Sequence, residues 1–193
     1  MVTPATYLNA HADKLEPHLE KLADLFQRME AAYDRVAAEY GFRCEGCADN
    51  CCLTLFHHHT LLEYLYLYRG YAQLAAEERD RLRQAALQVN TALAHAREKG
   101  ETVRIMCPLN RDGRCMLYNY RPMICRLHGI PHEMRGPGCG DFDRRSGDHP
   151  YIAFDRTPLY MEMARAEKAL REALNFKEKT RLTVAQMIAE FPA

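Results

Sequence analysis

The 193-residue sequence has no tryptophan, no excess of either charge and no long hydrophobic run. Lys plus Arg and Asp plus Glu each number 26, so the formal net charge is +0 and nothing draws the chain to nucleic acids or anionic membranes. No apolar stretch approaches the roughly 18 residues that cross a bilayer, and the first residues, MVTPATYLNAHADK, lack the apolar core of a signal peptide. We therefore expect a cytoplasmic protein that binds neither nucleic acid nor membrane.

Motifs for nucleotide or serine chemistry are also missing. The sequence has no GxxxxGK phosphate-binding loop, no GxGxxG after a strand and no GxSxG around a serine nucleophile. It has instead 8 cysteines, in a composition that is 48% hydrophobic and 27% charged. These proportions are typical of a folded domain, and we expect residues 1–193 to form a single one.

The first part of the chain predicts a long amphipathic helix. Apolar residues recur there in alternating steps of four and three, at Leu15, Leu19, Leu22, Phe26, Met29, Tyr33, Val36 and Tyr40. Gly41 should end this helix, and Pro17 predicts that its regular part begins near His18 or is kinked there. Because the repeat is short and Leu25 widens the apolar stripe, packing against a core is favoured over a two-stranded coiled coil.

Further helices are predicted from their start signals. Capping boxes at 60–63 (TLLE) and 183–186 (TVAQ) each place a threonine three residues before Glu or Gln, and Thr157 followed by proline marks another start. The run EERDRLRQAALQVNTALAHAREKG predicts a helix that Gly100 ends. Residues 101–149 contain mostly short apolar pieces between Pro, Gly and Cys. We expect a mainly α fold, in which a helical scaffold carries cysteine-rich irregular loops and at most a short β-hairpin.

The cysteines form two sets. They are Cys44, Cys47, Cys51 and Cys52, written CEGCADNCC, and Cys107, Cys115, Cys125 and Cys139. In a reducing compartment such a number indicates metal ligands or redox groups before disulfides. Two cysteines separated by two residues can turn both thiolates toward one ion, while Asp112 and Gly113 predict a turn that brings Cys107 and Cys115 alongside each other on a hairpin. We predict that all eight are metal ligands.

Several alternatives remain open. An isolated cysteine is usually a small buried hydrophobic residue, but four within nine residues, among acidic and amide side chains, do not form an apolar stripe. Disulfides are the second interpretation, because the count is even. Adjacent Cys51 and Cys52 cannot easily reach one ion, so the thiolates could form two sites, or one site with spare cysteines. Four thiolates suit both a tetrahedral zinc ion and a [4Fe-4S] cluster, so the donor set leaves the metal open.

The cysteine motifs also carry a resemblance to a known family. The patterns CEGCADNCC, CPL and CMLYNYRPMICR, from Cys44 to Arg126, resemble the zinc- or iron-chelating cysteine-cluster family, called YkgJ-like or CxxCxxCC and often labelled iron-sulfur oxidoreductases. Cys139 resembles a further cysteine of some members. The chain has three residues between Cys47 and Cys51 where the plainest form of the motif has two. The resemblance implies a metal centre and, by analogy with flagellin lysine methylases of similar cysteine motif, a methyl-transfer or redox enzyme.

Basic residues lie beside the cysteines. Arg121 and Arg126 bracket Cys125, and we expect them to offset the charge of a thiolate-bound cofactor or to donate to sulfur or backbone carbonyls, unless they form ordinary surface salt bridges. Residues 57–59 are three histidines, but consecutive side chains diverge, so solvated or capping histidines are favoured over ligands. His128 is the histidine best placed to complete a mixed site.

The sequence thus predicts a metal-binding protein with a cysteine-ligated centre. An iron-sulfur cluster, of the 4Fe-4S type, is favoured over zinc, with an electron-transfer or redox role. The first alternative is a structural zinc-binding interaction module. The second is a lysine methylase-like iron-sulfur enzyme acting on a protein. A protein partner or substrate is expected in both alternatives, and the sequence does not identify it.

Overall fold

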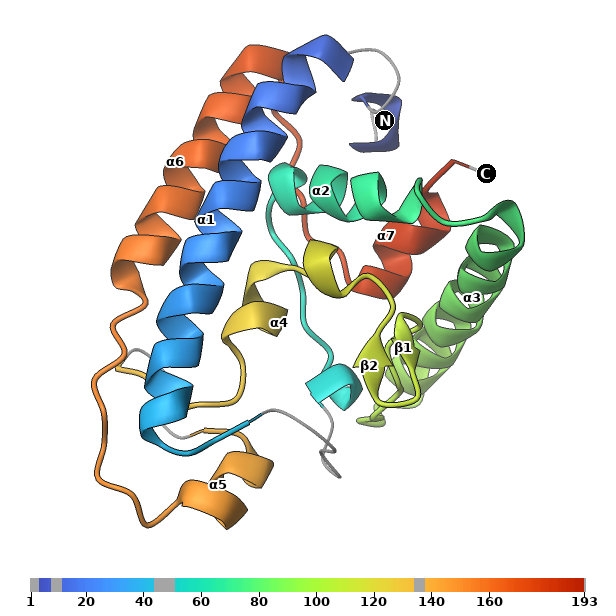
Figure 1. Cartoon of the computed structure of the whole chain (residues 1–193). Helices are drawn as coiled ribbons and strands as arrows, with labels where there is room; N and C mark the ends of the chain where they lie inside the picture. Colours follow the sequence, from blue (N-terminus) through green and yellow to red (C-terminus); the bar gives the residue numbers. More distant parts are fainter. Residues whose placement is uncertain (1–3, 8–11, 44–50, 134–137, 193) are drawn as a thin grey trace.

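The computed structural model describes residues 4–7, 12–43, 51–133 and 138–192. The α-helices are α1 (Ala12–Glu39), α2 (Leu61–Tyr71), α3 (Ala76–Glu98), α4 (Met123–Leu127), α5 (Gly140–Ser146), α6 (Thr157–Leu174) and α7 (Val184–Glu190). Short 3-10 turns occupy Pro4–Tyr7, Cys51–Leu53 and Tyr118–Tyr120, and the strands are β1 (Asn110–Arg111) and β2 (Arg114–Cys115). The mainly α fold with one short hairpin is confirmed for these residues (Figure 1).

Helices α1 and α6 lie side by side along one side of the molecule (Figure 1). Every residue of the apolar seam predicted in α1 is buried, and so is Leu25, so this stripe faces the core as expected. Gly41 adopts a left-handed conformation with φ of 63°, and the Phe42 N–H donates to the Ala37 carbonyl at 2.8 Å, which closes the helix end. Of the two expectations for Pro17, a start near His18 is wrong, because α1 begins at Ala12 and includes Pro17 in its second turn on the exposed side, and a kink there stays a prediction.

A second pair, α3 and α7, packs on the opposite side (Figure 1). The capping box predicted at Thr183 is complete: its hydroxyl accepts from the Gln186 N–H at 3.2 Å, and the Gln186 side chain accepts from the Thr183 N–H at 2.9 Å. The Asn90 side chain of α3 donates to the carbonyl of Ala185 at 3.2 Å. This contact joins α3 to the first turn of α7.

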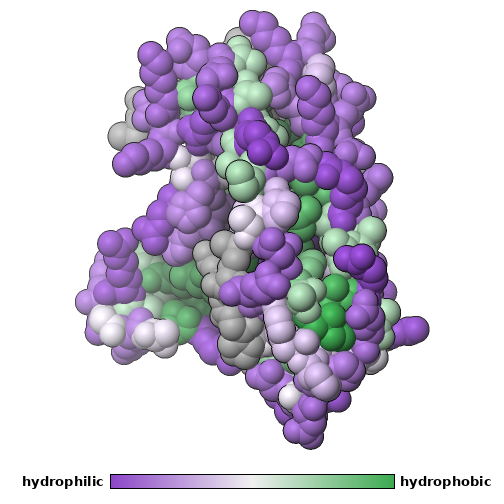
Figure 2. Space-filling model, turned by 90° about the vertical axis from the view of Figure 1, so that its left-hand side faces the viewer, coloured by the Kyte–Doolittle hydropathy of each residue, from purple (hydrophilic) through white to green (hydrophobic). Residues whose placement is uncertain are grey.

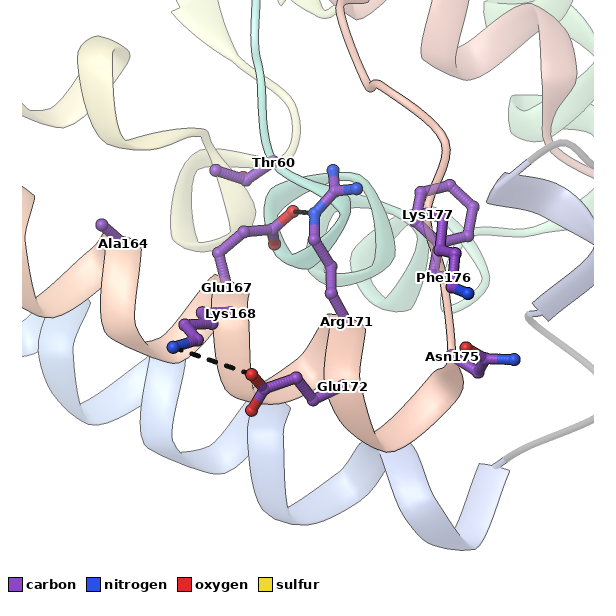
Figure 3. Close-up of a pocket in the computed structure, with 9 residues that line it drawn as sticks. All are labelled: Thr60, Ala164, Glu167, Lys168, Arg171, Glu172, Asn175, Phe176 and Lys177. Atoms are coloured by element: carbon purple, nitrogen blue, oxygen red, sulfur yellow. Dashed lines mark hydrogen bonds and ion pairs between the residues drawn. The ribbon is translucent and has the colours of Figure 1, made fainter.

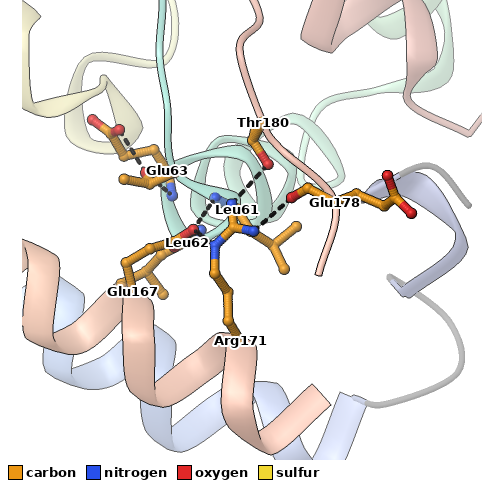
Figure 4. Close-up of polar contacts among 8 residues, drawn as sticks. Leu61, Leu62, Glu63, Glu167, Arg171, Glu178 and Thr180 are labelled. Atoms are coloured by element: carbon orange, nitrogen blue, oxygen red, sulfur yellow. Dashed lines mark hydrogen bonds and ion pairs between the residues drawn. The ribbon is translucent and has the colours of Figure 1, made fainter. Parts of the chain in front are cut away.

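Helix α2 lies between the two pairs, and a buried carboxylate fixes its amino-terminal end. Glu167 of α6 accepts hydrogen bonds from the N–H groups of Leu61 and Leu62 at 2.8 and 2.9 Å (Figure 4). Arg171, one turn further along α6, pairs with Glu167 and also donates to the Thr180 hydroxyl at 3.1 Å. A carboxylate at a helix N-terminus satisfies free N–H groups and complements the helix dipole, so this network ties α2, α6 and the segment before α7 together.

One continuous cluster of buried hydrophobic residues draws on all the larger helices. Figure 2 shows one face of the molecule, where hydrophilic residues predominate and hydrophobic ones gather in a few places, among them a hollow in the surface. Within the described residues, no helix combines the length and apolar character needed to cross a membrane.

Candidate metal centre

The segment after α3 contains the predicted tight hairpin, but only Cys115 lies on it: Cys107, which was expected alongside Cys115 on the hairpin, precedes the first strand. Asn110 pairs with Cys115 across β1 and β2, and the turn residues Asp112 and Gly113 have φ values of 52° and 82°. These positive values fit the two-residue turn predicted from the sequence, because Asp and Gly tolerate a left-handed backbone. Just before the hairpin, the Cys107 N–H donates to the carbonyl of Cys52 at 2.9 Å. The first cysteine stretch is thereby joined to the second.

Four sulfurs from separate segments lie close enough to influence one another. Burial, reinforced by Cys52 and Cys115, raises the pKa of Cys107 to about 12, while burial and Cys52 raise the pKa of Cys115 to about 11. The pKa of Cys125 is raised well above its usual value by burial and then by the other three sulfurs. Cys52, Cys107, Cys115 and Cys125 therefore form a cluster, which we call the four-sulfur cluster.

Cys52 differs from the other three members of this cluster. A hydrogen bond from the Cys51 thiol lowers the pKa of Cys52 to about 6, helped by the Asn110 side chain and opposed by burial. Backbone N–H groups also face the sulfurs: Leu109 donates to Cys107, and Leu117 donates to Cys115. Amides directed at sulfur favour the thiolate over the thiol, so the local backbone is arranged to accept negative charge on the sulfurs.

The remaining cysteines are placed differently. The six described cysteines are free, so no disulfide joins them to one another. Cys139 caps α5, where its sulfur accepts from the Phe142 N–H at 3.4 Å, and its own N–H donates to the Gly129 carbonyl at 2.7 Å. Cys44 and Cys47 lie outside the described residues. As the side chains lie here, no group of three or more His, Cys, Asp or Glu among the described residues is arranged to hold a metal ion.

Arg126 and Arg121 stabilise the turn that precedes Cys125. Arg126 is only 3% exposed, forms an ion pair with Glu30 of α1 and stacks over Phe26, with 4.1 Å from the guanidinium carbon to the ring centroid. Its Nε donates to the carbonyl of Arg121 at 2.8 Å, and Arg121 pairs with Glu30 at 3.2 Å. Both cations also oppose the rise in the pKa of Cys115. The two arginines thus bind backbone and carboxylate groups directly and act on a sulfur through their charge.

A buried carboxylate for which the sequence predicted only a capping role also positions α4. Glu63 was predicted to complete a capping box with Thr60, and the Thr60 hydroxyl does accept from the Glu63 N–H at 3.1 Å. The Glu63 carboxylate, however, accepts from the Thr60 hydroxyl at 2.6 Å and from the N–H of Met123 at 2.8 Å. Met123 is the first residue of α4, two positions before Cys125. The Glu63 carboxylate therefore holds the first residue of α4, the helix that carries Cys125. Its hydrogen bond with the distant Met123 distinguishes Glu63 from an ordinary capping residue.

The histidines take three different environments. His57 is half-buried and His59 is exposed, as expected for solvated side chains. His58 is 3% exposed, and its backbone pairs with Leu182 through hydrogen bonds of 2.8 and 3.0 Å. Burial, helped by His57 and His59, lowers the pKa of His58 to about 4. His128 packs against Phe56 with 5.5 Å between ring centroids.

A cavity of about 1140 Å³ adjoins the four-sulfur cluster. All six described cysteines line it, together with His58, His128, Arg121 and Arg126. Apolar residues of α3, of the segment after α3 and of α7 form one part of its wall, namely Val89, Leu93, Val103, Ile105, Val184 and Ala185. Another part comes from α1 and includes Tyr33, Ala37 and Asp34, and Arg43 and Arg114 add further charges. The sulfurs therefore face a space large enough for a small organic molecule.

A second cavity, of about 480 Å³, is a shallow depression along α6 (Figure 3). Glu167 and Arg171 in its wall bind each other and the end of α2, and Lys168 pairs with Glu172 at 3.7 Å. These charged groups thus pair with one another, and the residues that line the depression include no cysteine or histidine that could bind a metal.

Comparisons with protein-family models, with curated proteins and with solved structures found no match to this chain.

Proposed function

We propose that the protein binds a metal centre through cysteine thiolates, with an iron-sulfur cluster favoured over zinc and a redox or electron-transfer role. The observation that carries the proposal is the four-sulfur cluster: Cys52, Cys107, Cys115 and Cys125 are partly buried, come from separate segments of the chain, line one cavity and influence one another electrostatically. Four soft sulfur donors are the donor set that zinc and iron-sulfur clusters share.

The electrostatics of the cluster support a cation among the sulfurs. Four thiolates held together repel one another, and burial adds to this cost. A metal cation converts the repulsion into attraction, and the N–H groups of Leu109 and Leu117 lower the charge on two of the sulfurs. When bound, an iron-sulfur cluster supplies one-electron transfer, and zinc supplies a structural crosslink.

Surrounding residues would serve such a centre. Arg126 fixes the turn before Cys125 and places positive charge near Cys115, which favours a centre that keeps net negative charge. The Glu63 carboxylate holds the first N–H of α4, so that Cys125 is presented from a defined helix end. These contacts support the cofactor-related role expected for Arg126 and extend it to Glu63.

The test is metal identity and stoichiometry on protein purified without oxygen. Brown protein that contains iron and sulfide and absorbs near ~400 nm, as iron-sulfur clusters do, supports the favoured form. Colourless protein with stoichiometric zinc supports instead a structural zinc-binding interaction module. Protein with neither metal, prepared with iron and zinc supplied in the medium, contradicts the proposal.

The ligand assignment is tested by single substitutions. Cys107→Ser and Cys125→Ser should lose most of the metal, because each removes a sulfur of the cluster. Cys139→Ser is the matched control: serine also caps helices, so α5 should persist and the metal content should stay unchanged. Full metal content in both cluster variants would remove the assignment.

A further inference from the structure

A buried side-chain donor lies on the hairpin beside the four-sulfur cluster. The Nδ2 atom of Asn110 is buried, and no group in the described part of the chain accepts a fully formed hydrogen bond from it. Burying a polar group without a partner is unfavourable, and most buried polar side-chain atoms are paired. An unpaired donor beside a candidate metal centre therefore indicates an acceptor that belongs to the centre.

The oxygen of the same side chain is already used by the fold. The Oδ1 atom of Asn110 accepts from the N–H of Gly113 at 3.2 Å, across the turn of the hairpin. This contact assigns the two ends of the amide, because the Gly113 N–H needs an acceptor. The Nδ2 end is thus left as a donor whose position the turn restricts.

Backbone contacts hold Asn110 next to three cysteines of the cluster. Its N–H donates to the Cys107 carbonyl at 3.0 Å, and the Cys107 N–H in turn donates to the Cys52 carbonyl at 2.9 Å. Asn110 is also the residue that pairs with Cys115 across β1 and β2. The asparagine is therefore fixed among the cysteines by its backbone, and its Nδ2 group is not needed for that purpose.

Cys52 carries the sulfur on which the Asn110 amide acts. The Cys51 thiol lowers the pKa of Cys52 most, and the Asn110 side chain lowers it further, against the effect of burial. A donor has this effect because it favours the charged form of a sulfur over the neutral form. A metal-bound thiolate keeps part of its negative charge, so it is a better acceptor for this donor than a neutral thiol.

We propose that Asn110 is a positioning residue of the centre: its Nδ2–H group donates to the Cys52 sulfur, holds that sulfur toward the other three and reduces its negative charge when it binds a metal. The inference deepens the proposed function and rests on it for its chemical purpose. Groups that hydrogen-bond to metal ligands strengthen metal binding, and hydrogen bonds to the sulfurs help to set the potential of iron-sulfur clusters. The contact itself requires only Cys52, so the two ideas can fail separately.

The first experiment observes the Asn110 side-chain amide directly by nuclear magnetic resonance. Isotope-labelled, metal-free protein is compared with Cys52→Ala, which removes the acceptor sulfur, and with Cys139→Ala, which removes the sulfur that caps α5. The Nδ2 proton resonances of Asn110 should move in Cys52→Ala and stay in place in Cys139→Ala. Unchanged resonances in Cys52→Ala, or equal changes in both variants, would overturn the proposal.

The second experiment titrates Zn²⁺ alone into metal-free protein kept without oxygen. Asn110→Asp retains an oxygen for the Gly113 N–H but loses the donor, and Arg111→Gln makes the same change in net charge on the same strand while the donor stays. Added negative charge attracts Zn²⁺, so weaker binding in Asn110→Asp reports the lost donor. We expect Asn110→Asp to bind Zn²⁺ about tenfold more weakly than the wild type and Arg111→Gln to bind it at least as tightly as the wild type. Wild-type affinity in Asn110→Asp would overturn the proposal.

A reduction potential gives a readout that a merely structural role of Asn110 would not move. In protein with an iron-sulfur cluster, both variants should lower the potential through their charge, and Asn110→Asp should lower it further because the sulfur also loses its donor. Equal potentials in Asn110→Asp and Arg111→Gln would contradict the inference.

Metal content of the wild type separates this inference from the proposed function. Asn110 resonances that respond to Cys52→Ala in a protein that binds neither iron nor zinc leave the contact standing while the metal proposal fails. A full metal centre in a protein whose Asn110 resonances ignore Cys52→Ala has the opposite meaning.

Discussion

The α1–α6 pair and the cysteine-bearing segments of the same chain are stabilised in different ways. The helix pair buries a repeated apolar stripe, so many side chains each contribute to its stability. The segment around Cys125 also buries Met123 and Leu127 in the core, and in addition it is positioned by polar contacts with distant residues, namely Met123 with Glu63 and Arg126 with Glu30. The α1–α6 pair is thus stabilised by apolar packing, while the position of the Cys125 segment depends in addition on a few polar residues, Glu63, Arg126 and Glu30.

The largest expected effect tests the helix pair. Leu22 is 0% exposed in the seam of α1, so Leu22→Ala removes buried methyl groups and leaves a cavity that costs about 4 kcal/mol in the free energy of unfolding. Chemical denaturation should show the loss in one cooperative transition. Leu87→Ala, at an exposed position of α3, serves as the control and should change stability by less than about 0.5 kcal/mol. A comparable loss of unfolding free energy in both variants would contradict the view that the buried stripe of α1 stabilises the helix pair.

A pH effect should follow from His58. Its pKa is about 4 in the folded protein, below the usual value of 6.5, so the unfolded chain binds a proton at this residue between these two pH values and the folded chain does not. Folding stability should therefore fall as the pH drops from 6.5 to 4, by about 3 kcal/mol from this residue alone. Denaturation of wild type and His58→Phe at several pH values isolates this contribution. Identical pH dependence in both proteins would show that His58 is not a buried neutral imidazole.

The polar contacts of the site are tested at Glu63. Glu63→Ala leaves the buried N–H of Met123 without a partner and should cost about 2 kcal/mol, with faster hydrogen exchange in α4 than in α1. Glu63→Gln keeps an acceptor oxygen, and because burial raises the pKa of Glu63, loss of its charge should be tolerated. The expected stability of Glu63→Gln is close to that of the wild type. Unchanged exchange in α4 of Glu63→Ala would mean that this contact does not position Cys125.

The sequence allowed the local features of both regions to be predicted, but not the long-range ones. The seam of α1, the capping box at Thr183 and the turn at Asp112 each depend on residues within a few positions, and each was confirmed. The second role of Glu63 depends on Met123, sixty residues away, and sequence spacing does not reveal such a partner. The burial of His58 likewise depends on its pairing with Leu182.

The same limit applies to the candidate site. Eight cysteines were predicted as ligands, and this stays a prediction: Cys52, Cys107, Cys115 and Cys125 influence one another electrostatically, Cys139 also caps α5, and Cys44 and Cys47 lie outside the described residues. Sequence spacing alone cannot separate these roles, because a cysteine that caps a helix and one that binds metal both occur at loop ends beside glycine. For Pro17 the sequence left two outcomes open, a later helix start or a kink, and α1 continues through this residue because packing of the whole helix outweighs the one hydrogen bond that proline removes.

The smallest expected effect concerns the amino-terminal end of α7, which packs on α3 and lines the cavity beside the cysteines. Thr183→Ala removes the hydroxyl that accepts from the Gln186 N–H and should cost about 1 kcal/mol, since one N-terminal donor of α7 loses its partner. Thr183→Ser retains the hydroxyl and should keep most of the stability. Because Thr183, Val184 and Ala185 line the cavity beside His58, the alanine variant should also loosen that wall, which hydrogen exchange at the first turn of α7 would detect. Protection that is equal in the alanine and serine variants would show that packing against α3, and not the cap, holds this end of the helix.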